Sequence, residues 1–334
     1  MVNALAALVP VLIFLALLVI FDSFKLVPLR ALLRALGAGA LASLGALVIN
    51  DALLRGAAIP TALVVRYFAP ALEEALKLVP IVWAVRRQRV GFPVDAAIVG
   101  FAVGAGFALI ENVSYLQTLA SGNGWLWLVR GCGAAILHGA TTAIAAIWSQ
   151  SLAERHPERG LLVFLPGFLA AAIVHAVYNH FVLPPFVSMV LLLAALPPLV
   201  LMVFDRSERA TREWVGAGMD LDVELLRLIL SNEFGTTRLG RYLAQLRARF
   251  PGPVVADMFC LMRVELELSI RAKGLLLARE AGIDLPPDDE LAAQLAELRY
   301  LERSIGKTGL RALKPLKATT QKDQWHRALL ERRQ

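Results

Sequence analysis

Charged side chains occur inside an apolar segment that is long enough to cross a membrane. Residues 62–85 read ALVVRYFAPALEEALKLVPIVWAV, with Glu73, Glu74 and Lys77 near the middle. A charged side chain at the centre of a membrane helix costs about 2.5–3.5 kcal/mol on insertion scales, so such residues usually pair with one another or perform chemistry. Two carboxylates beside an ammonium group are able to do both.

Helical spacing allows the two acids to have different roles, without deciding which acid has which. Lys77 follows Glu74 by three residues and Glu73 by four, so the lysine can neutralise one carboxylate and leave the other available as a general base. We expect Glu73 to be the available acid and Glu74 to be oriented by Lys77.

Three further apolar segments carry polar residues at helical spacing. These residues are Phe107, Glu111 and Asn112, then His138, then His175 and Asn179. With a rise of 1.5 Å per residue, Glu73, Glu111 and the two histidines lie roughly 18–24 Å from the charged ends of their segments. They therefore fall in one layer of a hydrocarbon core about 30 Å thick. This common depth predicts a polar site built by four helices.

Hydrolysis by water is the chemistry that this set of residues favours. A buried carboxylate can act as a general base, and histidine and asparagine can stabilise a developing oxyanion. Cys132 lies nearly two helical turns before His138, and neither a cysteine nor a serine is evidently placed as a nucleophile. Direct attack by water is therefore expected.

The composition divides the chain into a membrane part and a charged tail. Of the 334 residues, 57% are hydrophobic and 18% are charged, and 41 of the 61 charged residues follow residue 204. We expect an all-α fold in which residues 1–204 form a polytopic membrane bundle. Residues 205–334 are amphipathic and predict a helical cytoplasmic domain. The net charge of +7 is spread along the chain, so we expect no nucleic acid partner.

About seven membrane spans are expected, and their loop charges predict an orientation. The spans are Ala4–Phe21, Leu36–Leu54, Ala62–Val85, Ala96–Leu119, Trp125–Ser149, Leu161–Leu183 and Phe186–Phe204. Arginines and lysines gather after the odd-numbered spans, whereas the alternate loops carry only Arg55 and Arg130. By the positive-inside rule, the N-terminus lies outside the cell and the tail lies in the cytoplasm.

The ordered motifs resemble those of a known family. Glu73-Glu74-x-x-Lys77, Phe107-x-x-x-Glu111-Asn112, His138 and His175-x-x-x-Asn179 are similar to the motifs of the PrsW family of intramembrane proteases. That family is distantly similar to the CAAX prenyl endopeptidases and bacteriocin-processing enzymes. The resemblance covers about residues 62–183 and does not extend to the tail.

The resemblance implies a glutamic-type intramembrane endopeptidase, which we expect to lie in a bacterial cell membrane and to need no metal. The implied catalytic residues are Glu73, Glu74, Glu111, His138, His175 and Asn179, with Lys77, Phe107 and Asn112 in support. The implied substrate is a membrane-spanning or membrane-associated protein, for example one like an anti-sigma factor, met in the lipid bilayer.

Three other interpretations use the same residues. His138, His175 and Glu111 could bind zinc in a metal-dependent protease, although the chain has no HExxH motif. Acids and histidines at mid-membrane depth also occur in proton-coupled transporters, which typically contain internal repeats that are not evident here. The bundle could also be a non-catalytic scaffold for the tail.

Overall fold

A computed structural model describes residues 2–56, 59–118, 124–231, 233–283, 285–286, 289–313 and 329–330. Every regular element in these ranges is helical, which confirms the expected all-α class. The chain separates into two compact units, Met1–Glu208 and Arg209–Gln334. This boundary and the expected division after residue 204 both fall within one long helix, α9 (Pro185–Leu230).

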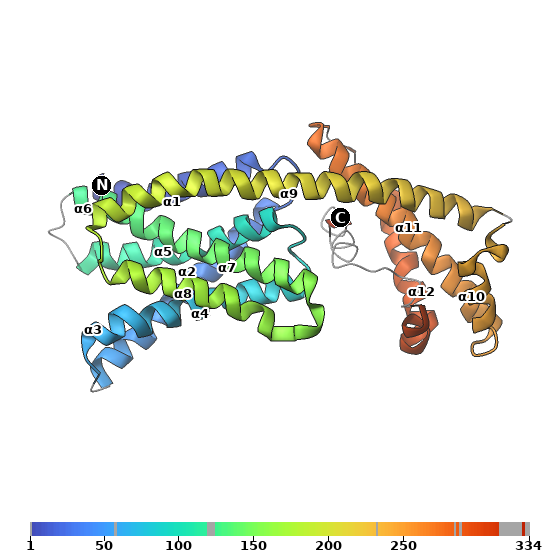
Figure 1. Cartoon of the computed structure of the whole chain (residues 1–334), viewed down its shortest axis with the longest axis horizontal. Coiled ribbons are helices and arrows are strands. Elements are labelled where there is room, and N and C mark those ends of the chain that lie inside the picture. The colour runs from blue at the N-terminus through green and yellow to red at the C-terminus, as the bar shows by residue number, and fades with distance from the viewer. Residues whose placement is uncertain are drawn as a thin grey trace. The chain divides into compact units, whose positions relative to one another are not determined.

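The first unit is a bundle of long helices joined by short turns (Figure 1). Its elements before α9 are α1 (Val2–Phe21), α2 (Leu29–Gly56), α3 (Thr61–Leu63), η1 (Val64–Phe68), α4 (Ala69–Arg86), α5 (Pro93–Thr118), α6 (Gly124–Val129), η2 (Arg130–Ala134), α7 (Ala135–Arg155), η3 (Pro157–Phe164) and α8 (Leu165–Asn179). Proline opens both α5 and α9, where its missing N–H breaks no helical hydrogen bond.

Among the described residues, six helical segments are long and apolar enough to cross a membrane, so the protein is an integral membrane protein. They are Val2–Phe21, Leu29–Gly56, Pro93–Thr118, Gly124–Arg155, Pro157–Asn179 and Pro185–Leu230. The remaining expected span, residues 62–85, is not among them. It is divided into α3, the π-helix η1 and α4, and α4 carries Glu73, Glu74, Lys77 and Arg86. Its helical structure agrees with the expectation, but it is more polar than the other spans.

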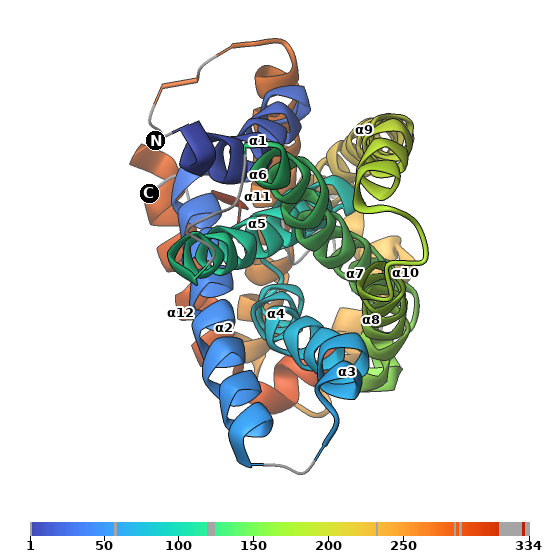
Figure 2. The ribbon, with the colours of Figure 1, turned by 90° about the vertical axis from the view of Figure 1, so that its left-hand side faces the viewer.

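Helix α5 lies at the centre of the bundle. It packs against α1, α2, α4 and α7, as the end view shows (Figure 2). In its most apolar stretch 78% of residues are buried, compared with 22% in α1 and in α2. Glycines permit this packing, because a Cβ added at Gly104 would lie 2.1 Å from the His138 carbonyl oxygen of α7. Small residues at helix contacts allow such close approach in membranes.

Helix α4 packs against α2, α7 and α8. The π-helix η1 precedes it directly, and a second π-helix, η2, directly precedes α7. Insertions of this kind inside α-helices often occur at functional sites because they change the direction in which side chains point. Both π-helices lie one to two turns before residues of the expected site.

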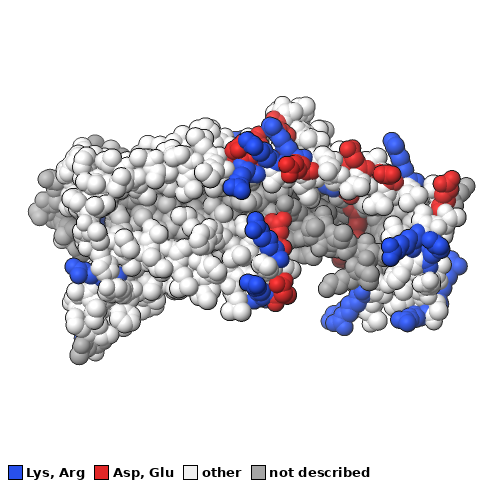
Figure 3. All heavy atoms as spheres, in the orientation of Figure 1, with Lys and Arg blue, Asp and Glu red and all other residues white. Residues whose placement is uncertain are grey.

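On the face of the bundle seen in Figure 3, charged side chains gather at one end and the rest of the surface is almost free of charge. Two hydrogen bonds hold the same end together. The Val94 N–H donates to the Ser207 hydroxyl at 3.3 Å, and the Gln150 amide donates to the Gly91 carbonyl at 3.0 Å. An uncharged band beside a charged end is the surface expected of a protein embedded in lipid.

The second unit is also helical and contains η4 (Phe234–Thr236), α10 (Arg238–Leu246), α11 (Gly252–Glu280) and α12 (Asp289–Leu313). A buried ion pair joins α11 to the last part of α9. The Lys273 ammonium lies 2.6 Å from the Asp222 carboxylate and 5.1 Å from the Trp214 ring centroid. An added Cβ at Gly218 would lie 2.7 Å from this ammonium, so the glycine makes room for the lysine.

Candidate active site

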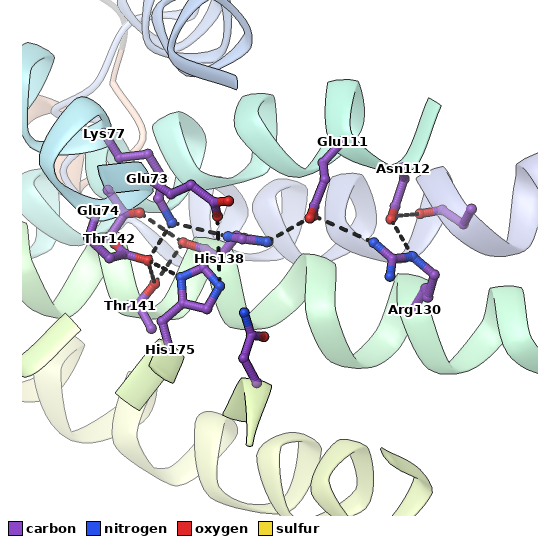
Figure 4. A network of polar contacts seen from close by, with 12 residues as sticks. Glu73, Glu74, Lys77, Glu111, Asn112, Arg130, His138, Thr141, Thr142 and His175 are labelled. Atoms are coloured by element: carbon purple, nitrogen blue, oxygen red, sulfur yellow. Dashed lines mark hydrogen bonds and ion pairs between the residues drawn. The ribbon is translucent and has the colours of Figure 1, made fainter. Parts of the chain in front are cut away.

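The bundle brings together five of the six expected catalytic side chains (Figure 4). Glu73 and Glu74 come from α4, Glu111 from α5, His138 from α7 and His175 from α8. A continuous set of polar contacts, described below, connects the four helices. The structure therefore brings these five side chains together.

Glu74 is held on several sides. Its Oε1 atom lies 2.6 Å from Lys77 Nζ, 2.9 Å from His175 Nδ1 and 3.2 Å from Thr141 Oγ1. The Lys77 and Glu74 side chains are 0% and 2% exposed. Two charges taken out of water are tolerated only when they are paired and hydrogen-bonded, and both conditions are met here. Glu74 is therefore suited to positioning its neighbours.

His138 bridges Lys77 and Glu111. Its Nδ1 atom lies 3.1 Å from Lys77 Nζ and its Nε2 atom lies 2.9 Å from Glu111 Oε2. An ammonium group can only donate hydrogen bonds and a carboxylate can only accept them. Nδ1 therefore accepts from Lys77, and Nε2 carries the proton and donates to Glu111.

The expected support by Phe107 has a physical basis in the structure. The ring centroid of this buried residue lies 4.9 Å from Lys77 Nζ and 5.1 Å from the His138 ring centroid. An aromatic face attracts a cation at this distance, and the attraction is stronger when the cation is shielded from water. Phe107 thus helps to hold the lysine and the histidine in place.

Glu73 differs from Glu74 because it faces a cavity. Its Oε1 atom accepts a hydrogen bond from Asn50 Nδ2 at 3.3 Å, and its Oε2 atom lies 3.8 Å from His175 Nε2. Among the described residues, Glu73 lines a cavity of about 490 Å³ and Glu74 does not. Of the two acids, Glu73 is thus the one that water and substrate can reach.

The polar contacts continue from Glu111 to Arg130, a residue that the sequence motifs do not contain. The charge of Arg130 suggests a loop position. In the structure, however, Arg130 begins the π-helix η2. Its Nη2 atom lies 3.6 Å from Glu111 Oε2, and its Nε atom donates to Asn112 Oδ1 at 3.2 Å. Asn112 in turn donates to the Ala7 carbonyl at 2.8 Å. The expected supporting role of Asn112 is therefore to hold Arg130 beside Glu111 and to tie α5 to α1.

Asn179 is the expected site residue that lies apart from the network of contacts. Its Nδ2 atom donates to the Val65 carbonyl of η1 at 3.2 Å. It lines the same cavity as Glu73 and His175, but it is only half-buried. The structure thus places Asn179 at the edge of the site.

Two threonines of α7 complete the site. Thr141 contacts Glu74, and Thr142 Oγ1 donates to the His138 carbonyl at 2.8 Å. The available signal in the sequence is weak: Thr141 follows His138 by three residues, so the two share a helix face. A lone threonine at this spacing is too common to predict a role.

A group of three potential metal ligands occurs among the described residues. Ligand atoms of Glu73, His138 and His175 lie within 4.8 Å of one another. The zinc ligands expected from the sequence include Glu111, which in the structure is hydrogen-bonded to His138. Glu73 takes its place in the group of potential ligands. One glutamate and two histidines are a ligand set of catalytic zinc sites. However, the lone pair of His138 Nδ1 is bonded to Lys77, and Nε2 carries the proton donated to Glu111. The arrangement therefore does not fit a metal ion held by all three residues.

The fold and the site together define an integral membrane protein with an acid–base centre enclosed by its helices. The model of the family described as PrsW family intramembrane metalloprotease matches residues 27–204, which is just over half of the 334 residues. The chain belongs to this family and is a membrane protease, as the motifs predict. Membership favours a protease over a transporter or a scaffold. Neither the curated proteins nor the solved structures contain a match to the chain.

Proposed function

We propose that the protein is a glutamic-type intramembrane endopeptidase in which Glu73 activates a water molecule. The observation that carries the proposal is the contrast between the two adjacent acids. Glu74 is bonded to Lys77 and His175, whereas Glu73 lines the cavity. A general base must reach the proton that it removes, and of the two acids Glu73 meets this requirement.

The proposed reaction balances with water as the only co-reactant. Glu73 takes one proton from water while the water oxygen attacks the carbonyl carbon of the peptide bond. His175, held through Nδ1 by Glu74, presents Nε2 to the same water, and the Asn179 amide donates to the oxyanion of the tetrahedral intermediate. When the C–N bond breaks, Glu73 returns its proton to the departing amine nitrogen.

The remaining expected residues act on the geometry of this centre. Lys77 holds Glu74 and His138 together, and Glu111 fixes the ring of His138 through Nε2. Preorganised groups of this kind lower the barrier because they need not rearrange as charge develops. Glu74, Glu111 and His138 are therefore proposed as positioning residues.

The proposed substrate is a segment of a membrane-spanning protein, for which an anti-sigma factor in a bacterial cell membrane is one model. The cavity volume of about 490 Å³ and its lining by both polar and apolar side chains suit a short peptide stretch. Its position among membrane helices suits a substrate that arrives through the bilayer.

Comparison of membrane-protein fragments tests the proposal in cells. Cells that produce the wild-type protein should accumulate specific cleavage fragments, which quantitative mass spectrometry can identify. Glu73→Gln should reduce these fragments by about 10²–10⁴-fold, the usual contribution of a general base. Glu158→Gln is a matched control, because Glu158 is 66% exposed in η3. Equal fragment levels with Glu73→Gln and wild type at equal expression would contradict the proposal.

The same fragments allow a test of the metal question with purified protein. The candidate ligands are Glu73, His138 and His175, but His138 would first have to give up its bond to Lys77 or to Glu111. A bound zinc ion would supply a Lewis acid for the attacking water. We expect cleavage to continue after exhaustive chelation and dialysis. Loss of cleavage on chelation, with recovery on addition of zinc, would instead support the metal-dependent interpretation.

A further inference from the structure

Helix α2 supplies a side chain to the site that none of the motifs includes. Asn50 of α2 donates from Nδ2 to Glu73 Oε1 at 3.3 Å, and it lines the same cavity as Glu73. The two residues are 23 positions apart and belong to different helices. The contact therefore depends on the packing of α2 against α4.

The chemistry of Glu73 fixes the orientation of the Asn50 amide. A carboxylate only accepts hydrogen bonds, so the NH₂ group must face Glu73 and the amide oxygen must face away. Asn50 Oδ1 is buried and has no hydrogen-bond partner among the described residues. Because this atom is closed off from solvent, Asn50 acts on Glu73 through its NH₂ group alone.

Ser43 shows that this feature belongs to the cavity-facing side of α2. It precedes Asn50 by seven residues, or two helical turns, and it lines the same cavity. Its hydroxyl is also buried without a partner in the described structure. Of these two residues of α2, Asn50 is the one that touches Glu73.

We infer that Asn50 positions the carboxylate of Glu73 for the removal of a proton from water, an inference that rests on the proposed function. Its NH₂ group donates to Glu73 Oε1, which leaves Oε2, on the side of His175, to accept the proton. The hydrogen bond fixes the orientation of the carboxylate and takes part in no proton transfer, so the reaction balances as described above.

A role in catalysis predicts a different outcome from a role in packing. Asn50→Leu keeps the number and branching of the side-chain heavy atoms but removes the donor to Glu73. We expect kcat to fall about 10–100-fold, with KM within twofold and an unchanged melting temperature, because the group acts in the transition state. A packing role would lower the melting temperature together with the amount of active protein.

Coupling to Glu73 supplies a second readout. Glu73→Asp keeps a carboxylate but withdraws it by one methylene group from Asn50. In this background Asn50→Leu should cost less than in the wild type, because the shortened carboxylate no longer reaches the Asn50 donor. Equal costs in both backgrounds would overturn the inference.

The controls separate failure of this inference from failure of the proposed function. Asp51→Leu makes a matched change at the next residue, where the exposed side chain pairs only with Arg55 in the described structure, and it should leave kcat unchanged. If Glu73→Gln abolishes cleavage but Asn50→Leu has no effect, the inference about Asn50 is wrong and the proposed function stands. If Glu73→Gln retains cleavage, the proposed function is wrong and the inference fails with it.

Discussion

At the scale of residues, the buried ammonium group of Lys77 holds the centre of the site together. Lys77 Nζ lies 2.6 Å from Glu74 and 3.1 Å from His138, with the Phe107 ring on a further side. These contacts direct the other nitrogen of His138 toward Glu111. The lysine therefore determines both the partner of Glu74 and the hydrogen-bonding pattern of His138.

Removing this cation alone should be more harmful than removing the pair of charges. Lys77→Met leaves the Glu74 carboxylate buried without its cation, and breaking a buried pair in this way typically costs about 3–5 kcal/mol. We expect a large fall in the melting temperature of the purified protein in detergent, together with loss of cleavage.

The double variant Lys77→Met with Glu74→Gln should recover much of the stability, because no uncompensated charge remains and the glutamine oxygen can still accept from His175. It should not recover cleavage, since His138 no longer has Lys77 as a hydrogen-bond partner. Strictly additive losses of stability in the double variant would show that the two side chains are not coupled.

Local contacts within the site could be predicted from the sequence, and contacts between distant segments could not. The pairing of Lys77 with Glu74 follows from helical spacing alone, and the common depth of Glu111, His138 and His175 follows from counting residues. Arg130 and Asn50 could not be predicted in this way. Their roles depend on the π-helix that turns Arg130 inward and on the packing that brings α2 beside α4.

At the scale of elements, the site depends on contacts between helix backbones. Gly104 of α5 meets α7 at the backbone of His138 and Gly139. The clustering of small residues in the sequence predicts close packing, but it does not indicate which residues touch. The structure shows that one such contact is made by Gly104 with the backbone of His138.

A methyl group at this contact should disturb catalysis. In Gly104→Ala, the new Cβ would lie 2.1 Å from the His138 carbonyl oxygen and 2.7 Å from Gly139 Cα, so α7 must move. Forced overpacking typically costs about 1–3 kcal/mol. We expect a lower melting temperature and at least a tenfold loss of cleavage.

Gly37→Ala is the matched control in α2, since an added Cβ at Gly37 has nothing within 4 Å. It should be neutral or slightly stabilising, because alanine favours helix more than glycine does. Wild-type cleavage by Gly104→Ala would show that His138 tolerates movement of its backbone.

At the scale of the whole molecule, α4 determines which side of the membrane each terminus occupies. Within the described ranges, six apolar segments meet the length and composition of a membrane span, and six crossings would place both termini on one side. Residues 61–86 form a continuous helical stretch of 26 residues through α3, η1 and α4, which spans roughly 39 Å. A seventh crossing by this stretch places the termini on opposite sides, as the loop arginines predict.

Labelling of single cysteines can decide between six and seven crossings. In a background lacking Cys132 and Cys260, Val2→Cys should react with an impermeant maleimide added outside spheroplasts, because Val2 is 72% exposed. Gln245→Cys, at an exposed position of α10, should react only after the membrane is opened. Labelling of both positions from the same side would mean that α4 does not cross, and that its acids enter the bundle from one face of the membrane. Labelling from opposite sides would place Glu73 on a spanning helix, where only neighbouring helices can supply the partners that its charge requires.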